Sequence, residues 1–139
     1  MEIRVLAYNE GKFILSKDVT AERIKEKQLS INIAPILKYR EDDDIVGALL
    51  NIDYSFEGET LLFLGMVVTV LADSIKDLLK DPDKSAAKQA LKPVWDVALG
   101  MARGILAEKT QGTLLDHIIL PIIDIEKFSE LTVFVKEDK

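Results

Sequence analysis

The sequence contains no cysteine and only one histidine among its 139 residues. Without cysteine the chain has no disulfide, no thiolate nucleophile and no Cys-ligated zinc site. The single histidine, His117, lies between Asp116 and Ile118 in an otherwise apolar stretch, and no Gly-x-Ser-x-Gly motif surrounds any serine. A catalytic triad needs a nucleophile, a base and an orienting acid that converge. We therefore predict no catalytic residues, no metal site and no cofactor.

Long hydrophobic runs are also missing. The longest apolar stretch lies near residues 61–68, which is far shorter than the roughly 20 residues that a membrane-spanning helix needs. The N-terminus carries Glu2 and has no apolar run of signal-peptide length. These features predict a cytoplasmic protein that does not insert into membranes.

Basic residues are outnumbered, because 18 Lys and Arg stand against 24 Asp and Glu and give a net charge of −6 at pH 7. This charge repels a phosphate backbone, so nucleic acid is not an expected partner. Hydrophobic residues make up 48 % and charged residues 30 % of the chain, which is typical of a globular protein. The length and the lack of repeats or linkers predict a single domain over residues 1–139.

The first half of the chain has the alternation of β-strands. Every second residue from Val46 to Phe56 is apolar, which predicts a strand with one buried face. The short break Glu57–Glu59 separates this strand from the apolar run 60–71, and such a pair indicates a hairpin. The acidic run Glu41–Asp44 precedes the hairpin. It lacks the ligand spacing and the glycine of a calcium loop, so we interpret it as a solvated turn.

Two further strands are predicted upstream. Residues 29–40 alternate between apolar and polar, and Pro35 within them favours an edge position or a bulge because proline has no N–H. Residues 4–16 form the fourth strand, with a bend at Gly11. The intervening residues 19–27 are compatible with a short helix or a loop.

The second half changes to helical spacing. Residues 72–80 predict one short helix, and residues 85–109 predict a long helix with a wide apolar face. Pro93 must kink this long helix or begin its second part. An extended apolar segment follows over residues 114–128, then a short final helix and a tail. The predicted fold class is α+β, with a four-stranded antiparallel sheet followed by a short and a long helix on one face.

Such a fold leaves apolar side chains on the sheet face that the helices do not cover: Ile45, Leu49, Leu61, Phe63, Val67 and Leu71. Leaving a side chain of this kind in water forfeits about 1.5–3 kcal/mol. We therefore expect a second chain to cover them. The cover is either another copy in a homo-oligomer or a different polypeptide that binds to an open surface.

Three stretches, in their order and spacing, resemble the SecB family of protein-export chaperones. Residues 58–67 are similar to the family's Gly-Glu-x-x-Ala-Phe-Leu-Cys-Glu-Val. Ala102-Arg103, which leads to Gly112-Thr113, resembles the family's Ala-Arg that leads to Arg-Gly-Thr-Phe. Residues 120–128 are similar to Leu-Ala-Pro-Val-Asn-Phe-Asp-Ala-Leu-Tyr, and Tyr8 matches an N-terminal strand tyrosine.

The resemblance implies a cytosolic holdase chaperone without ATPase activity, built as a dimer of dimers, which holds unfolded polypeptides in long apolar grooves. It implies an oligomer interface at Phe63, Gly65 and Val67. It also implies a peptide-binding groove lined by Trp95, Leu120, Ile122 and Phe128.

The resemblance has limits that leave alternatives open. The family docks the export motor SecA through acidic side chains on two strands, but here Met66 replaces one acid and residues 11–16 carry none. These differences argue against docking to SecA. A SecB-like adaptor or oligomeric scaffold with one dedicated partner, such as an antitoxin, is the alternative function. A small-molecule enzyme or binding protein with a cavity under the long helix is the third and least supported.

Overall fold

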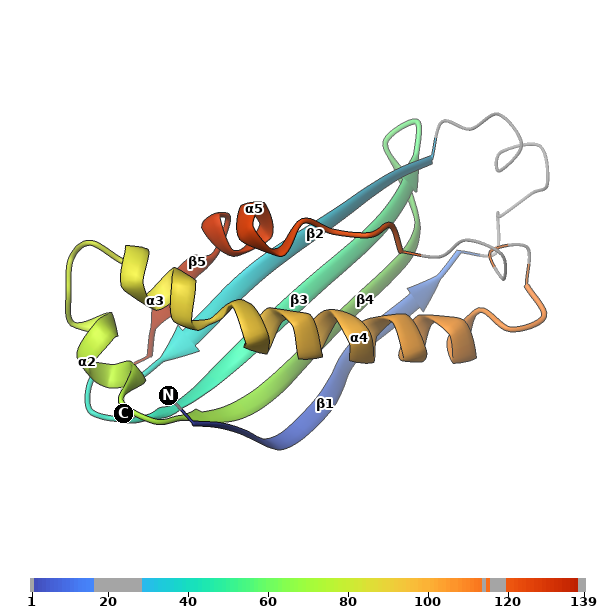
Figure 1. The fold of residues 1–139 in the computed structure, drawn as a ribbon. Coiled ribbons are helices and arrows are strands. Elements are labelled where there is room, and N and C mark those ends of the chain that lie inside the picture. The colour runs from blue at the N-terminus through green and yellow to red at the C-terminus, as the bar shows by residue number, and fades with distance from the viewer. Residues whose placement is uncertain (1, 17–28, 114, 116–119, 138–139) are drawn as a thin grey trace.

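The computed structural model describes residues 2–16, 29–113, 115 and 120–137. They form a five-stranded sheet in the order β1-β4-β3-β2-β5, with the helices on one face (Figure 1). The strands are β1 (Ile3–Leu15), β2 (Leu29–Tyr39), β3 (Ile45–Phe56), β4 (Glu59–Ala72) and β5 (Val133–Lys136). The helices are α2 (Ile75–Leu79), α3 (Ser85–Ala90), α4 (Lys92–Lys109) and α5 (Ile125–Glu130). The predicted α+β class with four antiparallel strands followed by helices is confirmed.

The β3–β4 hairpin is closed by a two-residue turn. Glu57 and Gly58 both have positive φ, at 50° and 81°. A turn with two positive φ angles twists in the same sense as the strands that it joins, which makes it a favoured hairpin connection. Tyr54 then pairs with Leu62 and Val46 with Val70 across the hairpin, so the sequence alternation of the two strands is in phase.

The long first strand, β1, is bent by two irregularities. It pairs antiparallel with β4, and its register shifts between Val5 and Ala7 and again between Glu10 and Lys12. Each shift leaves one extra residue in β1, and Gly11 is the second of them, as the sequence predicted. An extra residue bends a strand and increases its twist locally.

The other side of the sheet ends in a small fifth strand that the sequence analysis did not predict. β5 pairs parallel with β2, and the pairing begins at Ile36 opposite Val133. Pro35 precedes this paired stretch and lies opposite Leu50 of β3. Because proline donates no backbone hydrogen bond, it fits a place where the outer edge of β2 is not paired.

The helical half differs from the prediction mainly in where helices break. The short helix is only Ile75–Leu79, and the predicted long helix is divided at Leu91 into α3 and α4. Pro93 lies in the first turn of α4, where the missing N–H has no intrahelical acceptor to lose. The final short helix is α5, which begins at Ile125, so the predicted extended segment 114–128 is wrong over its last four residues, and residues 114 and 116–119 of it lie outside the described part of the chain. The segment 19–27 and His117 lie outside the described residues.

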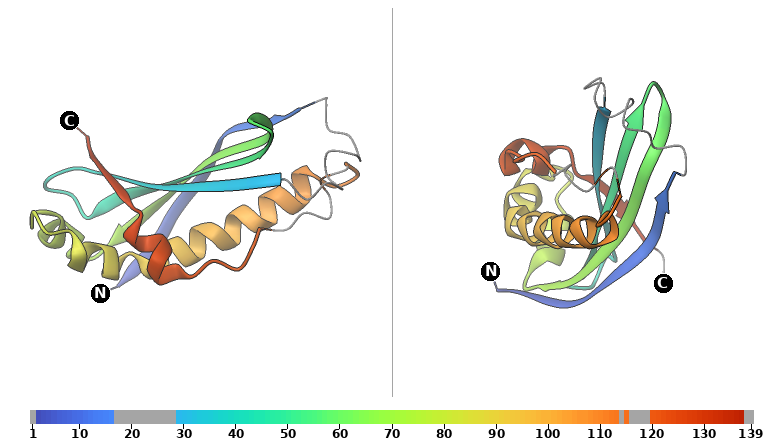
Figure 2. Two further views of the ribbon diagram at one scale, coloured as in Figure 1. Left: turned by 90° about the horizontal axis from the view of Figure 1, so that it is seen from above. Right: turned by 90° about the vertical axis from the view of Figure 1, so that its right-hand side faces the viewer.

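The core lies between one face of the sheet and the helices, which Figure 2 shows together on one side. Alternate residues of β3 and β4, such as Leu50 and Val68, are fully buried on this face. Ala98 and Ala102 of α4 are also fully buried, and their small side chains let the helix lie close to the sheet. Among the described residues, no helix has the length and apolar content to cross a bilayer.

The acidic turn before β3 holds the start of α2. Asp44 Oδ1 accepts a hydrogen bond from the Lys76 backbone N–H at 3.2 Å, and its carbonyl accepts one from Ala72 at 2.9 Å. Asp42 forms an exposed ion pair with Lys80 at 3.7 Å. In the described part of the chain, no cluster of three His, Cys, Asp or Glu side chains is arranged to hold a metal. The turn is therefore accounted for by its structural contacts.

The hairpin turn gives a first prediction. Gly58→Ala forces a Cβ into the left-handed region and should lower the free energy of unfolding by about 1 kcal/mol. Gly100→Ala is the matched control, because Gly100 lies in α4 with open space around its missing Cβ and should gain up to about 1 kcal/mol from helix propensity. Urea denaturation of both variants checks the prediction. Equal effects in the two variants would contradict it.

Candidate polypeptide-binding site

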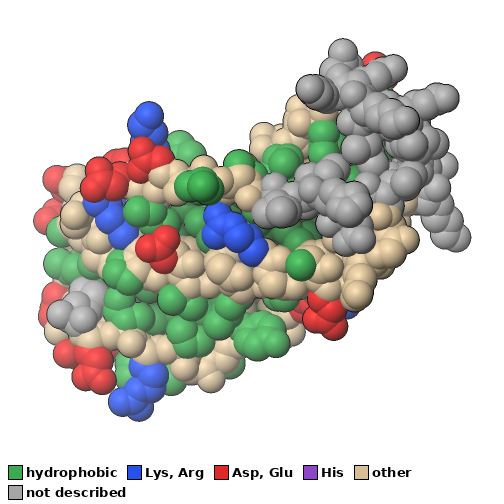
Figure 3. All heavy atoms as spheres, turned by 45° about the vertical axis from the view of Figure 1, so that its right-hand side comes forward, with side chains coloured by type: hydrophobic (Ala, Val, Ile, Leu, Met, Phe, Trp, Pro, Cys, Tyr) green, Lys and Arg blue, Asp and Glu red, His purple; other side chains and the backbone are tan. Residues whose placement is uncertain are grey.

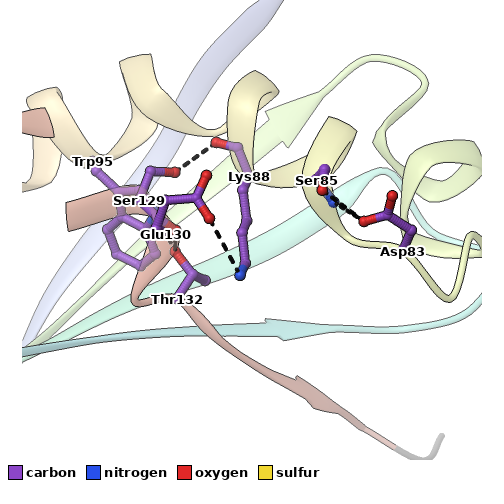
Figure 4. A network of polar contacts seen from close by, with 7 residues as sticks. All are labelled: Asp83, Ser85, Lys88, Trp95, Ser129, Glu130 and Thr132. Atoms are coloured by element: carbon purple, nitrogen blue, oxygen red, sulfur yellow. Dashed lines mark hydrogen bonds and ion pairs between the residues drawn. The ribbon is translucent and has the colours of Figure 1, made fainter. Parts of the chain in front are cut away.

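Trp95, a predicted groove residue, is fully buried in α4. Its indole Nε1–H donates to Thr132 Oγ1 at 3.1 Å, and that hydroxyl donates to the Ser129 carbonyl at 2.6 Å (Figure 4). The indole ring meets the Phe128 ring edge to face, with ring centroids 5.8 Å apart. A buried indole N–H needs such an acceptor. Trp95 is therefore a fully satisfied core residue that joins α4 to the C-terminal segment.

Further polar contacts fix α5 on the helices beneath it. Ser129 Oγ donates to the Lys88 carbonyl of α3 at 2.5 Å, and the Lys88 ammonium lies 3.8 Å from Glu130 (Figure 4). Lys92 of α4 pairs with Glu126 at 3.2 Å. The hydrogen bond contributes more than the ion pairs, because the carboxylates are exposed to water. Together these contacts hold the C-terminal segment against α3 and α4.

The other predicted groove residues divide into buried and exposed. Leu120 and Phe128 belong to the same core as Trp95, with 4 % and 5 % of their surfaces exposed, whereas Ile122 is 99 % exposed. Arg103 Nη2 donates to the Pro121 carbonyl at 3.1 Å and so holds the chain between Leu120 and Ile122 on α4. In the protomer, only Ile122 of the four side chains is open to an incoming polypeptide. Their role in peptide binding stays a prediction.

The predicted oligomer-interface residues lie together on the sheet face that carries no helices. Phe63, Gly65 and Val67 are half-buried neighbours on β4 and line a hollow of about 330 Å³. Asn51 and Phe63 pack closely over Gly65, because a Cβ there would lie 3.3 Å from both Asn51 Oδ1 and Phe63 Cε1. This face lacks a helical cover, as the alternation implied. The prediction was wrong for Leu61, which is fully buried, because the register shift between Tyr54 and Ser55 leaves it as an extra residue in β4. The assignment of this face to a homo-oligomer interface stays a prediction.

Sequence reasoning missed the outer edge of β1. β1 is the terminal strand of the sheet, and among the described residues no strand pairs with its outer side. Val5, Leu6 and Ile14 are exposed, and Tyr8 is 60 % exposed. The two extra residues of β1 interrupt its alternation of apolar and polar residues, so the alternation did not indicate this surface. The high apolar content of residues 3–15 is the signal in the sequence that could have indicated it.

Beside this edge, α4 presents an apolar flank. Arg103 contacts Pro121 on one flank of α4, and the helical spacing places Val97 and Met101 on the other flank. At the C-terminal end of α4, Lys109 lies 3.7 Å from Glu10 of β1 and 5.7 Å from the centre of the Phe13 ring. The second flank therefore runs toward β1.

We call the apolar surface between α4 and β1 the edge strip. It consists of Val5, Tyr8, Val97 and Met101. Val5 pairs with Val70 and Tyr8 with Val68, so both point to the helix-covered side of the sheet. Figure 3 shows hydrophobic side chains gathered along α4 on this side of the molecule. Val5 and Tyr8 belong to the terminal strand, so these two residues of the strip lie directly beside the open backbone edge.

Two ionisable groups have shifted pKa values with structural causes. Burial raises the pKa of Tyr54, whose hydroxyl is enclosed without a hydrogen-bond partner in the core. The hydroxyl and backbone N–H of Ser85 donate to Asp83, at 2.6 Å and 3.0 Å, and lower the pKa of that carboxyl. Asp83 is fully exposed in front of α3, where its carboxylate holds the first residue of the helix. Neither group lies at the edge strip.

No protein-family model matches this sequence, and no curated protein matches it either.

The Trp95 hydrogen bond gives a second prediction. Thr132→Val keeps the shape of the side chain but leaves the buried indole N–H without an acceptor, so it should lower the free energy of unfolding by about 1–3 kcal/mol. Trp95→Phe combined with Thr132→Val should cost less than the sum of the single changes, because each removes the same bond. Urea unfolding, followed by circular dichroism, measures both. Strict additivity would show that the bond contributes nothing.

Tyr54 gives a third prediction. Because its hydroxyl has no partner, Tyr54→Phe should leave the free energy of unfolding at neutral pH unchanged or raise it by up to about 1 kcal/mol. Above pH 10, which is about the ordinary pKa of tyrosine, the unfolded state loses the phenol proton, whereas burial raises the pKa of Tyr54 and the folded state keeps the proton. The wild type should therefore lose stability as the pH rises through that range, and the variant should lose less. Denaturation curves that fall in parallel would refute this.

Proposed function

We propose that this protein is an ATP-independent holdase chaperone that binds extended segments of unfolded or non-native polypeptides. The observation that carries the proposal is the outer edge of β1. The strand runs over 13 residues and is exposed along most of its length, and no strand among the described residues pairs with its outer side. The edge strip of Val5, Tyr8, Val97 and Met101 lies beside it.

The chemistry of an open strand edge matches that of an unfolded chain. A terminal strand presents backbone N–H and C=O groups that another extended chain satisfies by adding as a further strand. Alternate side chains of the added strand then point toward the helix side, where the edge strip receives them. Burial of apolar surface contributes about 25 cal/mol per Å². Backbone pairing and apolar burial require no particular client sequence and no nucleotide.

The proposal also accounts for the net charge of the chain and includes its assembly into an oligomer. The net charge of −6 favours cationic unfolded clients and limits aggregation of an open apolar surface. Assembly of several copies, in the manner of a dimer of dimers, would multiply the binding segments that one client meets. The resemblance to the SecB family supports this proposal and adds a cytoplasmic location. The differences at Met66 and residues 11–16 argue against SecA as a partner.

The fourth prediction tests the holdase proposal. At a stoichiometric ratio and without nucleotide, the protein should suppress aggregation of a chemically unfolded client, followed by light scattering. Tyr8→Asp and Val97→Asp place a charge in the edge strip and should weaken client binding about tenfold, equivalent to about 1.4 kcal/mol. Leu131→Asp is the matched control, because Leu131 is also exposed but lies at the end of α5. It should leave suppression unchanged.

Three outcomes would change the conclusion. If unrelated clients aggregate unhindered, the holdase proposal fails and the adaptor with one dedicated partner replaces it. If Tyr8→Asp and Val97→Asp suppress aggregation as well as the wild type, the edge strip is not the binding site. If Ile122→Asp alone weakens suppression, clients bind along the segment after α4, as the family resemblance implies.

A further inference from the structure

A contact between α4 and β1 lies at one end of the edge strip. Glu10 is opposite Met66, which is buried, so its side chain points to the same side of the sheet as those of Val5 and Tyr8. The Glu10 carboxylate lies 3.7 Å from the ammonium group of Lys109, in the last turn of α4. This ion pair joins the helix to the terminal strand next to Tyr8.

More apolar surface lies beyond this ion pair on the same side of β1. Phe13 is opposite Leu64, which is fully buried, so it belongs to the same row of side chains as Val5 and Tyr8. The Lys109 ammonium lies over the Phe13 ring, 5.7 Å from its centre. A lysine lays its methylene chain on apolar surface while its charged end stays in water. Lys109 therefore covers the surface that would lengthen the edge strip.

The register of β1 gives this row a regular spacing. Val5, Tyr8, Glu10 and Phe13 lie opposite every second residue of β4, because the two extra residues of β1 have no partner there. Counted from the Val5 end, a regular client strand beside β1 would meet Val5 and Tyr8 with residues i and i+2. Its residue i+4 would meet the ion pair, and residue i+6 would meet Phe13. The open part of the row spans about 7 Å, and the row to Phe13 spans about 20 Å.

The ion pair favours water over an apolar neighbour. The side chains of Lys109 and Glu10 are 40 % and 34 % exposed, so both charges remain hydrated and their pairing contributes little to the stability of the fold. An apolar client side chain packed on them would remove this water without replacing its hydrogen bonds, which is unfavourable. A polar client residue at i+4 has no such cost.

We propose that Lys109 and Glu10 limit the length of the apolar segment that the edge strip binds. The selected segment has two apolar residues at alternate positions, i and i+2, followed by polar residues, and a longer apolar run gains nothing further. This inference rests on the proposed holdase function and names the class of segment that the same site selects. Lys109 is the specificity-determining residue, because it both pairs with Glu10 and covers Phe13.

The fifth prediction compares two labelled peptides, Lys-Ser-Val-Ser-Val-Ser-Ser-Ser-Ser-Lys and the longer apolar Lys-Ser-Val-Ser-Val-Ser-Val-Ser-Val-Lys. Fluorescence anisotropy with the full chain should show that the wild type binds both with affinities within about twofold. The double variant Glu10→Val and Lys109→Ala makes the apolar row continuous. It should bind the longer apolar peptide about tenfold more tightly than the other, because two more valines are buried.

A matched control removes another exposed ion pair by the same substitutions. Glu126→Val and Lys92→Ala break the pair between α5 and α4, whose charged atoms are 3.2 Å apart, and should leave the two affinities as in the wild type. Lys109→Ala alone should also favour the longer apolar peptide, although less, and it keeps the test valid if the double variant does not fold. The fluorescence of Trp95, the only tryptophan, reports folding.

Four results would overturn the proposal. A wild type that already prefers the longer apolar peptide tenfold, Lys109 variants without a length preference, or an equal gain in the control pair would each do so, and a purely structural ion pair would give the second result. Failure of the wild type to bind either peptide would do so as well. Aggregation suppression, measured in parallel, separates these failures from failure of the holdase function, because suppression would persist if only the length limit is wrong.

Discussion

The sheet is wider than the helical layer that covers it, and the geometry of the molecule depends on this difference. The four long strands span about 14 Å from the axis of β1 to that of β2, and a helix with its side chains is about 10 Å wide. α4 lies over β3 and β4, and α3 and α5 continue the cover toward β2. β1 is left at the margin of the helical layer, and the second face of the sheet receives no cover. Both candidate binding surfaces are products of this incomplete coverage.

The spacing of apolar residues predicted those strands and helices that have the same environment along their whole length. β3 alternates strictly, and the structure buries the same face that the alternation indicated; Pro93 also lies where a new helix begins. β5 was not predicted because four residues are too short for a pattern and its pairing with β2 joins segments about 100 residues apart. Spacing favoured a core position for Trp95 and Phe128, which is where the structure places them, but it did not indicate what covers them. An apolar helical face indicates that something covers it, but the C-terminal segment that covers it is known only from the fold.

The candidate surfaces were predictable to different extents. Phe63, Gly65 and Val67 follow from alternation alone, because they occupy the positions of β4 opposite to the core. The pairing of Lys12 with Gly65 does not follow from alternation, because it depends on the two extra residues that shift β1 against β4. Cross-strand register is a property of two segments together. Which residues meet across the sheet is therefore known only from the assembled fold.

The asymmetry of the two sheet edges has a consequence for the size of any assembly. At the β2 edge, the chain's own β5 occupies Ile36–Tyr39, and Pro35 interrupts the donors next to it. A sheet with both edges available can grow without limit into a fibre, whereas a sheet that accepts a strand on one side only stops after a single addition. The short C-terminal strand therefore removes four residues of β2 from strand addition, which favours growth of an assembly at the β1 edge over growth at this part of the β2 edge.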